Sequence, residues 1–142
     1  MTKAVLIITN MGPKPSAPFQ GQFVKNQMLA LQKRQALAYF YMSWHNDSLV
    51  NRVLKYPVLF LQFFWSYIVS FKSFDVIHVH FFYPTIWLAL AYKYLRKPSV
   101  NIVVTCHGSD IYHYQPFNAL YRWCCGFVVV HAASSVILVD KK

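Results

Sequence analysis

The sequence contains no glutamate, and its acidic residues are the four aspartates Asp47, Asp75, Asp110 and Asp140. A mechanism that needs a pair of carboxylates must therefore draw on these four. Fourteen lysines and arginines oppose them and give a net charge of +10. So basic a chain suits nucleic acid, anionic lipid or phosphorylated substrates. Because the basic residues are scattered along the chain, we exclude nucleic acid and favour phosphate groups or a membrane surface.

Charged residues of both signs are also scarce, at 13% of the 142 residues, whereas hydrophobic residues make up 56% and aromatic residues 18%. This composition excludes an intrinsically disordered chain. The length fits one domain, residues 1–142, with a core of its own. A surface so poor in charge predicts that another domain, a partner chain or a membrane covers part of it.

Cysteines are few, and Cys106, Cys124 and Cys125 form an odd number without the spacing of a disulfide framework. This pattern favours a reducing compartment, and the adjacent pair is best read as core packing. The apolar run Ala4–Ile8 is too brief for the core of a signal peptide and instead predicts a strand. We expect the protein in the cytoplasm, either free or peripheral at the inner face of the membrane.

Strand-like and helix-like runs alternate along the chain, which predicts a Rossmann-like, doubly wound and mainly parallel α/β sheet of about five or more strands. The helix from Gly21 to about Arg34 buries Val24, Met28 and Leu31. A polar loop is expected at His45–Asn51. The expected strands are Ala4–Thr9, Ala36–Ser43, Val76–His80, Val100–Cys106 and Val136–Val139.

The stretch Lys55–Lys72 predicts a strongly apolar helix with Pro57 in its first turn. One helical stripe holds Phe60, Phe63, Phe64, Tyr67 and Phe71, and the opposite side is apolar too. The uncharged run Tyr56–Phe71 is shorter than the ~20 residues that a membrane span requires. We therefore expect a buried helix or one that lies on a membrane surface.

Polar residues follow two of the expected strands at their carboxyl ends, where open α/β sheets bind ligands. His80 ends one strand and is expected to line a cleft. The run His107-Gly108-Ser109-Asp110 follows the next strand. Here His107 can act as a base or donate to a phosphate or hydroxyl, and Asp110 can orient it. The alternative is a loop in which Asp110 caps backbone amides. Between these strands, Thr85 is placed to cap a helix over Ile86–Tyr94, which Pro98 stops.

The loop Asn10–Gln20 joins the first strand to the first helix. Gly12 and Gly21 can let backbone amides approach a phosphate at the helix N-terminus. The loop matches neither GxGxxG nor a Walker sequence, so the alternative is that both glycines only shape a turn.

His78 and His80 share one face of a strand. With Cys106 or His107 on the next strand, they make a zinc site conceivable, but no tight metal spacing supports one and we predict no metal. The simpler interpretation of His78 is a packed core histidine.

Four segments together resemble the N-terminal domain of glycosyltransferase family 4, the large retaining group with the GT-B fold. They read VLIITNMGP at Val5–Pro13, GQFVKNQMLALQKR at Gly21–Arg34, DVIHVHFFYP at Asp75–Pro84 and VVTCHGSDI at Val103–Ile111. Their order and spacing cover most of the chain. The resemblance further implies a helix over Pro116–Ala133 and a strand over Ser135–Val139.

The resemblance implies transfer of a sugar from a nucleotide-sugar donor to a glycan or glycolipid acceptor, without a further cofactor. In the family this domain mainly holds the acceptor, which assigns His80, Gly108 and Ser109 to the cleft. The glycine loop, here Gly12 and Gly21, approaches the donor phosphates. A histidine at the position of His107 lies near the transferred sugar, with Asp110 in the same loop.

The family's second domain binds the donor and carries a glutamate pair, which a chain without glutamate does not supply. The resemblance therefore predicts an acceptor-side half that is inactive alone: a truncated reading frame, a fragment, or one subunit of a split enzyme with a complementing C-terminal chain. Glycan assembly for a cell surface, such as a lipopolysaccharide, is a natural role. Two alternatives stay open: a non-catalytic module that binds a glycan or a partner, and a small membrane-embedded protein.

Overall fold

The protein forms one parallel β-sheet with helices on both faces. The computed structural model describes residues 3–42, 48–107, 123 and 135–138. The sheet has the strand order β2-β1-β3-β4-β5, and every neighbouring pair is parallel. Its strands are β1 (Val5–Thr9), β2 (Leu37–Tyr41), β3 (Val76–His80), β4 (Asn101–Cys106) and β5 (Ser135–Leu138). The α/β doubly wound fold and all five expected strands are thus confirmed.

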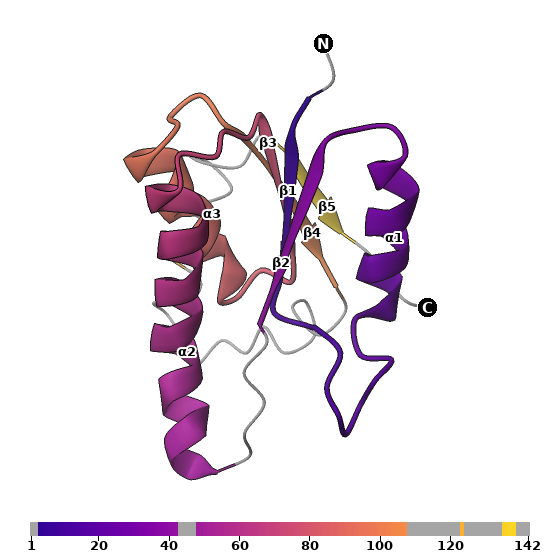
Figure 1. Cartoon of the computed structure of the whole chain (residues 1–142), viewed down its shortest axis with the longest axis vertical. Coiled ribbons are helices and arrows are strands. Elements are labelled where there is room, and N and C mark those ends of the chain that lie inside the picture. Colours follow the sequence, from indigo (N-terminus) through magenta and orange to yellow (C-terminus); the bar gives the residue numbers. More distant parts are fainter. Residues whose placement is uncertain (1–2, 43–47, 108–122, 124–134, 139–142) are drawn as a thin grey trace.

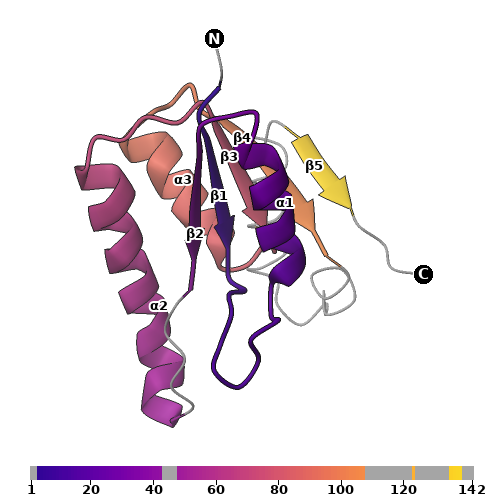
Figure 2. The ribbon, with the colours of Figure 1, turned by 45° about the vertical axis from the view of Figure 1, so that its right-hand side comes forward.

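The helices divide between the two faces of the sheet. Figures 1 and 2 show α1 (Gln22–Gln32) on one side, and α2 (Leu49–Phe63) and α3 (Thr85–Leu95) on the other. The chain runs from β1 outward to β2 and then returns to β3 on the other side of β1. The carboxyl ends of β1 and β3 therefore flank the point where the winding direction reverses, which is the usual ligand-binding position in such sheets.

Alternating side chains of the strands build two cores of unequal size. Leu6, Ile8, Ile77 and Val79 point to the side of α2 and α3, and Val5 and Ile7 point to α1. Val24 is buried in the smaller core, with Met28 and Leu31 packed against it as the helical spacing predicted. His78 and His80 alternate with Ile77 and Val79 on β3, so they face the side of α1.

The long apolar helix differs from its prediction. α2 begins at Leu49, where Ser48 caps it by accepting a hydrogen bond from the Asn51 amide at 3.3 Å. The expected loop therefore ends before Asn51, and Pro57 lies inside the helix instead of in its first turn. A π-helical segment, η1 (Phe64–Val69), follows directly. A serine cap decided the start because it satisfies an amide of the first turn, which a proline placed later does not do.

The predicted aromatic stripe on this helix is only partly buried. Phe63 and Tyr67 lie in the core, whereas Phe60, Phe64 and Phe71 are exposed. Leu59, which the stripe did not include, is buried in their place. The reason is the helical period: Leu59, Phe63 and Tyr67 follow each other at four-residue steps, and this single row faces the sheet.

The prediction that Thr85 caps α3 is wrong. Pro84 occupies the cap position, and Thr85 is the first helical residue. Its buried hydroxyl donates back to the carbonyl of Phe81, so it tightens the β3–α3 turn and does not satisfy the helix amides. At the other end the helix stops before Pro98 as expected, and the Arg96 amide donates to the carbonyl of Tyr92.

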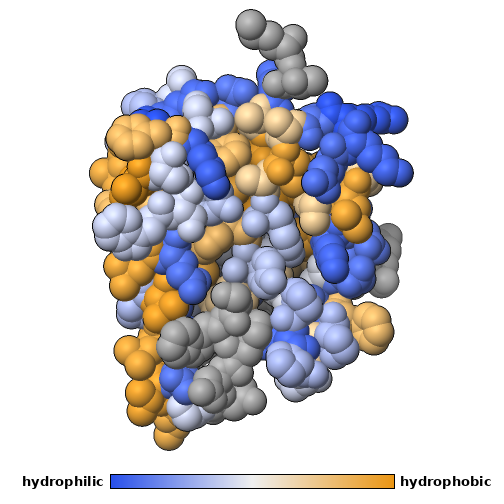
Figure 3. All heavy atoms as spheres, viewed as in Figure 1, coloured by the Kyte–Doolittle hydropathy of each residue, from blue (hydrophilic) through white to orange (hydrophobic). Residues whose placement is uncertain are grey.

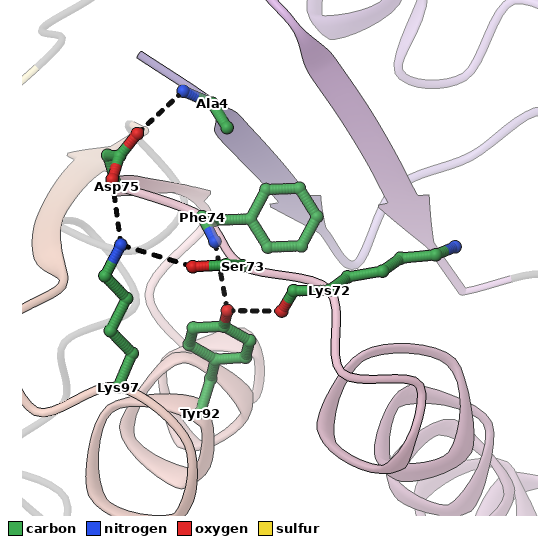
Figure 4. A network of polar contacts seen from close by, with 7 residues as sticks. All are labelled: Ala4, Lys72, Ser73, Phe74, Asp75, Tyr92 and Lys97. Atoms are coloured by element: carbon green, nitrogen blue, oxygen red, sulfur yellow. Dashed lines mark hydrogen bonds and ion pairs between the residues drawn. The ribbon is translucent and has the colours of Figure 1, made fainter.

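A polar network ties the amino end of β3 to α3, at the edge of the sheet opposite the candidate ligand site (Figure 4). Asp75 accepts from the Ala4 amide at 3.0 Å and pairs with Lys97 at 2.8 Å. The buried Tyr92 hydroxyl accepts from the Phe74 amide at 3.1 Å and donates to the carbonyl of Lys72 at 2.8 Å. The hydrogen bond from Lys97 is the main reason that the pKa of Asp75 lies below its usual value, and the Ala4 amide lowers it further.

Several predictions fall outside the described residues. They concern Gly108, Ser109, Asp110 and Cys124–Cys125, together with most of the helix expected over Pro116–Ala133; within that span Trp123 is helical. In the described part of the chain, no helix is both long and apolar enough to cross a membrane.

Candidate active site at the carboxyl edge of the sheet

Two histidines meet at the carboxyl edge of the sheet, beside the point where the winding direction reverses. His80 is the last residue of β3, and His107 directly follows β4. In the register of the two strands His80 lies beside Thr105, which brings His107 to the same end. Nδ1 of His80 and Nε2 of His107 are 3.2 Å apart, and the two rings stack at 5.5 Å between centroids. The expectation that both histidines lie at one edge is confirmed.

Aromatic side chains from two other segments enclose this pair. Phe23, in the first turn of α1, stands edge-on to His107 with centroids 5.0 Å apart and to His80 at 6.4 Å. Phe81 lies 4.4 Å from His107, also between centroids. Phe81 has φ 65, a left-handed conformation that is uncommon for a bulky residue and often marks functional sites. The imidazoles therefore sit in an apolar surround.

His80 is held neutral by this environment. The residue is 2% exposed. Burial, and then the proximity of His78 and His107, lowers its pKa to about 3. Its Nε2 is buried without a hydrogen-bond partner. With the proton on Nδ1, His80 donates to Nε2 of His107 and buries no N–H without an acceptor, so this tautomer satisfies the site best.

His78 lies two residues before His80 on β3, and its ring has a different hydrogen-bond partner. Its Nε2 lies 2.8 Å from Oγ1 of Thr105, and burial lowers its pKa below the ordinary value. We expected His78 to be the packed residue and His80 to line a cleft. The structure reverses their burial, because His80 lies beneath Phe23 and His107 whereas His78 is half-buried.

Both glycines of the loop after β1 are structurally required. Gly21 has φ 75, and a Cβ there would lie 2.8 Å from the Met11 carbonyl oxygen. A Cβ on Gly12 would lie 2.0 Å from the Tyr41 ring. Gly21 therefore shapes the turn through its left-handed backbone, and Gly12 makes room for the Tyr41 ring. Beside them, Asn10 donates from Nδ2 to the carbonyl of Tyr83 at 3.2 Å, while its Oδ1 is buried without a partner.

Metal binding and an open pocket are the other candidate features of the described chain. No cluster of His, Cys or Asp that could hold a metal occurs among the described residues, so the conceivable zinc site at His78 and His80 does not assemble there. An open pocket of about 380 Å³ lies between β2 and α2, where Tyr39 and Gln62 contribute to its lining. Burial, and then Tyr41, raises the pKa of Tyr39 to about 12, so its hydroxyl stays protonated at neutral pH.

Comparison with known proteins identifies the family of this chain. The family model described as Glycosyltransferase Family 4 matches residues 21–142. The chain belongs to glycosyltransferase family 4. It is thus a glycosyltransferase-like module with the fold of the N-terminal GT-B domain. A search of curated proteins found no match.

The family 4 module contains groups at this edge that the sequence analysis did not select. Asn10 follows a buried strand at its carboxyl end, the same signal that selected His80, and was overlooked. Phe23 and Phe81 carried no such signal, because their place beside His107 depends on how α1 and the β3–α3 turn pack. The chemistry of the described site is that of imidazoles, which accept and donate hydrogen bonds.

Proposed function

We propose that this chain is the acceptor-side half of a retaining glycosyltransferase, which transfers a sugar from a nucleotide-sugar donor to a glycan acceptor. The family match over residues 21–142 carries the proposal. The histidine pair supports the proposal, because it lies at the carboxyl edge of the sheet beside the point where the winding direction reverses, and open α/β sheets bind their ligands at such points. The net charge of +10 suits a phosphorylated donor and a lipid-linked acceptor at an anionic membrane surface.

In this proposal His107 contacts the transferred sugar. Its Nε2 is engaged by His80 at 3.2 Å, which fixes the orientation of the ring. An imidazole donates a hydrogen bond to a sugar hydroxyl or accepts one from it, according to its tautomer. His80 acts as a positioning residue, since it sets the ring orientation and tautomer of His107.

The remaining assignments follow the family resemblance. We assign to Asp110 the orientation of a sugar hydroxyl and to Gly108 and Ser109 the binding of the acceptor, whereas the buried His80 acts only through His107. The loop that Gly12 and Gly21 shape lies toward the donor phosphates. No cofactor or metal is part of the proposal. The donor is held by a second, C-terminal domain, and the acceptor-side half does not turn over without it.

Reconstitution with a donor-binding domain tests this function. The chain is mixed with a donor-binding domain of the family, a nucleotide sugar and glycolipid acceptors, and the released nucleoside diphosphate is measured. We expect release only when both halves are present. His107→Ala should lower kcat by about 10²-fold, because a hydrogen bond made at the reacting sugar is lost. Circular dichroism should show that the variant stays folded.

Cys106→Ala is the matched control, because Cys106 lies next to His107 but packs toward the opposite core. It should retain transfer within about twofold. Transfer by His107→Ala at the wild-type rate would remove His107 from the site. If acceptor glycan binds to the chain without any turnover in the mixture, the module is a non-catalytic binding domain and the proposal fails.

A further inference from the structure

The solvent-facing side of α2 and η1 is apolar along its whole length. Its large exposed side chains include Val53, Leu54, Leu61, Phe64, Trp65 and Phe71. Leu61 is 58% exposed, Trp65 65% and Phe71 75%. In Figure 3 hydrophobic spheres follow the left-hand side of the molecule, where Figure 1 places α2. From Leu49 to Val69 this surface is about 30 Å long, at ~1.5 Å per residue.

The core of the protein does not account for this surface. Leu59, Phe63 and Tyr67 on the opposite side of the same helix already fill the larger core. Of the exposed polar side chains, Gln62 and Ser66 line the open pocket beside β2, on one flank of the helix. An apolar surface of this extent, additional to the core, marks a face that binds a second phase or molecule.

Cations accompany the apolar side chains, and acids do not. Lys72 is exposed at the end of η1, and the Arg96 guanidinium lies 4.7 Å from the centre of the Phe71 ring. The ammonium of Lys55 lies 4.9 Å from the centre of the Tyr56 ring. The sequence from Ser48 to Phe74 contains no acidic residue, and Asp75, which follows it, is paired with Lys97. The face is thus complementary to an anionic surface.

We propose that the outer face of α2 and η1 docks this domain on an anionic lipid bilayer. The helix would lie parallel to the surface, because its inner face is packed on the sheet and only the outer face is available to the acyl chains. Exposed Trp and Phe beside Lys and Arg suit the boundary between headgroups and hydrocarbon. A straight helical face of this length matches a planar surface. The proposal concerns binding alone and does not depend on sugar transfer.

Co-sedimentation with vesicles tests the docking. The full chain is mixed with vesicles of phosphatidylcholine and phosphatidylglycerol, or of phosphatidylcholine alone. We expect partitioning at least about tenfold stronger to the anionic vesicles, decreasing as salt is added. Leu61→Ser combined with Trp65→Ser should weaken partitioning at least about tenfold, because both side chains lose their apolar burial. Trp65 fluorescence should shift to the blue when the wild-type chain binds.

Two control variants separate this face from a general effect of hydrophobicity or charge. Leu29→Ser removes a leucine that is 47% exposed on α1, on the other side of the sheet, and should bind like the wild type. Lys33→Gln should likewise retain binding, whereas Lys72→Gln should reduce it. Equal binding of wild type and the Leu61/Trp65 variant would overturn the proposal. A lipid-free dimer that this variant dissociates would also overturn it, since a second copy would then be the occupant.

Discussion

At the scale of single residues, His80 is only 2% exposed and forms a hydrogen bond with His107. An imidazole in an apolar surround is stable only in its neutral form, so the folded protein excludes a proton that the unfolded chain binds readily. His78 contributes in the same direction, because burial also lowers its pKa. The arrangement that keeps the site neutral therefore makes folding sensitive to mild acid.

We predict that stability falls as the pH decreases below the ordinary histidine pKa of about 6.5. Below that value the unfolded state binds a proton that the folded His80, with a pKa of about 3, does not. The free energy of unfolding should therefore drop by about 1 kcal/mol per pH unit between about pH 6.5 and 5. Urea denaturation followed by circular dichroism measures this slope.

The variant His80→Phe isolates the cause of the pH dependence. It should flatten the slope, leaving the part that His78 contributes, whereas Lys33→Gln should keep the wild-type slope. A variant with the full wild-type slope would show that another group accounts for the acid sensitivity.

At the scale of elements, one end of β3 contributes to the candidate site and the other end is bonded to α3. The carboxyl end presents His80, and the amino end is fastened to α3 through Tyr92 (Figure 4). The Tyr92 hydroxyl accepts a hydrogen bond from the Phe74 amide and donates one to the Lys72 carbonyl, both in the segment that leads into β3. The Tyr92 side chain is fully buried. Because parallel strands need a crossover helix between them, this bond helps position α3 between β3 and β4.

We predict that Tyr92→Phe lowers the free energy of unfolding by about 1–3 kcal/mol, because the Phe74 amide loses its partner in a buried setting and the part-buried bond to the Lys72 carbonyl is lost as well. Tyr94→Phe is the matched control on the same helix. Tyr94 is 58% exposed, and its change should stay within about 0.5 kcal/mol. Urea midpoints of both variants provide the test. Equal midpoints for the two would mean that the Tyr92 hydroxyl does not stabilise the fold.

At the scale of the whole molecule, charge is unbalanced and apolar surface is abundant. Asp75–Lys97 is the ion pair found in the described part of the chain, and both of its side chains are partly exposed. Such a solvent-exposed pair adds little to stability. The net charge of +10 therefore acts mainly through repulsion, which is stronger in the compact state than in the unfolded chain.

We predict that moderate salt stabilises the protein. Raising the ionic strength from about 0.01 M to about 0.15 M shortens the Debye length to about 8 Å and screens this repulsion. The melting temperature at pH 7 should rise by about 3 °C, corresponding to about 1 kcal/mol. Sodium chloride and choline chloride should act alike, because screening does not depend on the cation. A lower melting temperature in salt would indicate that attractive pairs outweigh the repulsion.

The sequence alone is sufficient to predict the alternation of strands and helices, and with it the parallel doubly wound fold. Runs such as Val76–His80 are apolar and bounded by polar or helix-breaking residues, so local chemistry is sufficient to define them. It also placed His80 and His107 at one edge, because the carboxyl ends of parallel strands coincide. The histidine part of the candidate site was therefore predictable before any coordinates.

Tertiary packing determined which side chains are buried and which of them contact the candidate site. It buried His80 rather than His78, brought Phe23 against both imidazoles of the site, and selected Leu59, Phe63 and Tyr67 as the inner row of α2. Local pattern could not rank these choices, because almost every position of α2 is apolar and either of two histidines on one strand face suits a core. The packing angle of each helix on the sheet determines which side chains are covered, and that angle depends on contacts between distant segments.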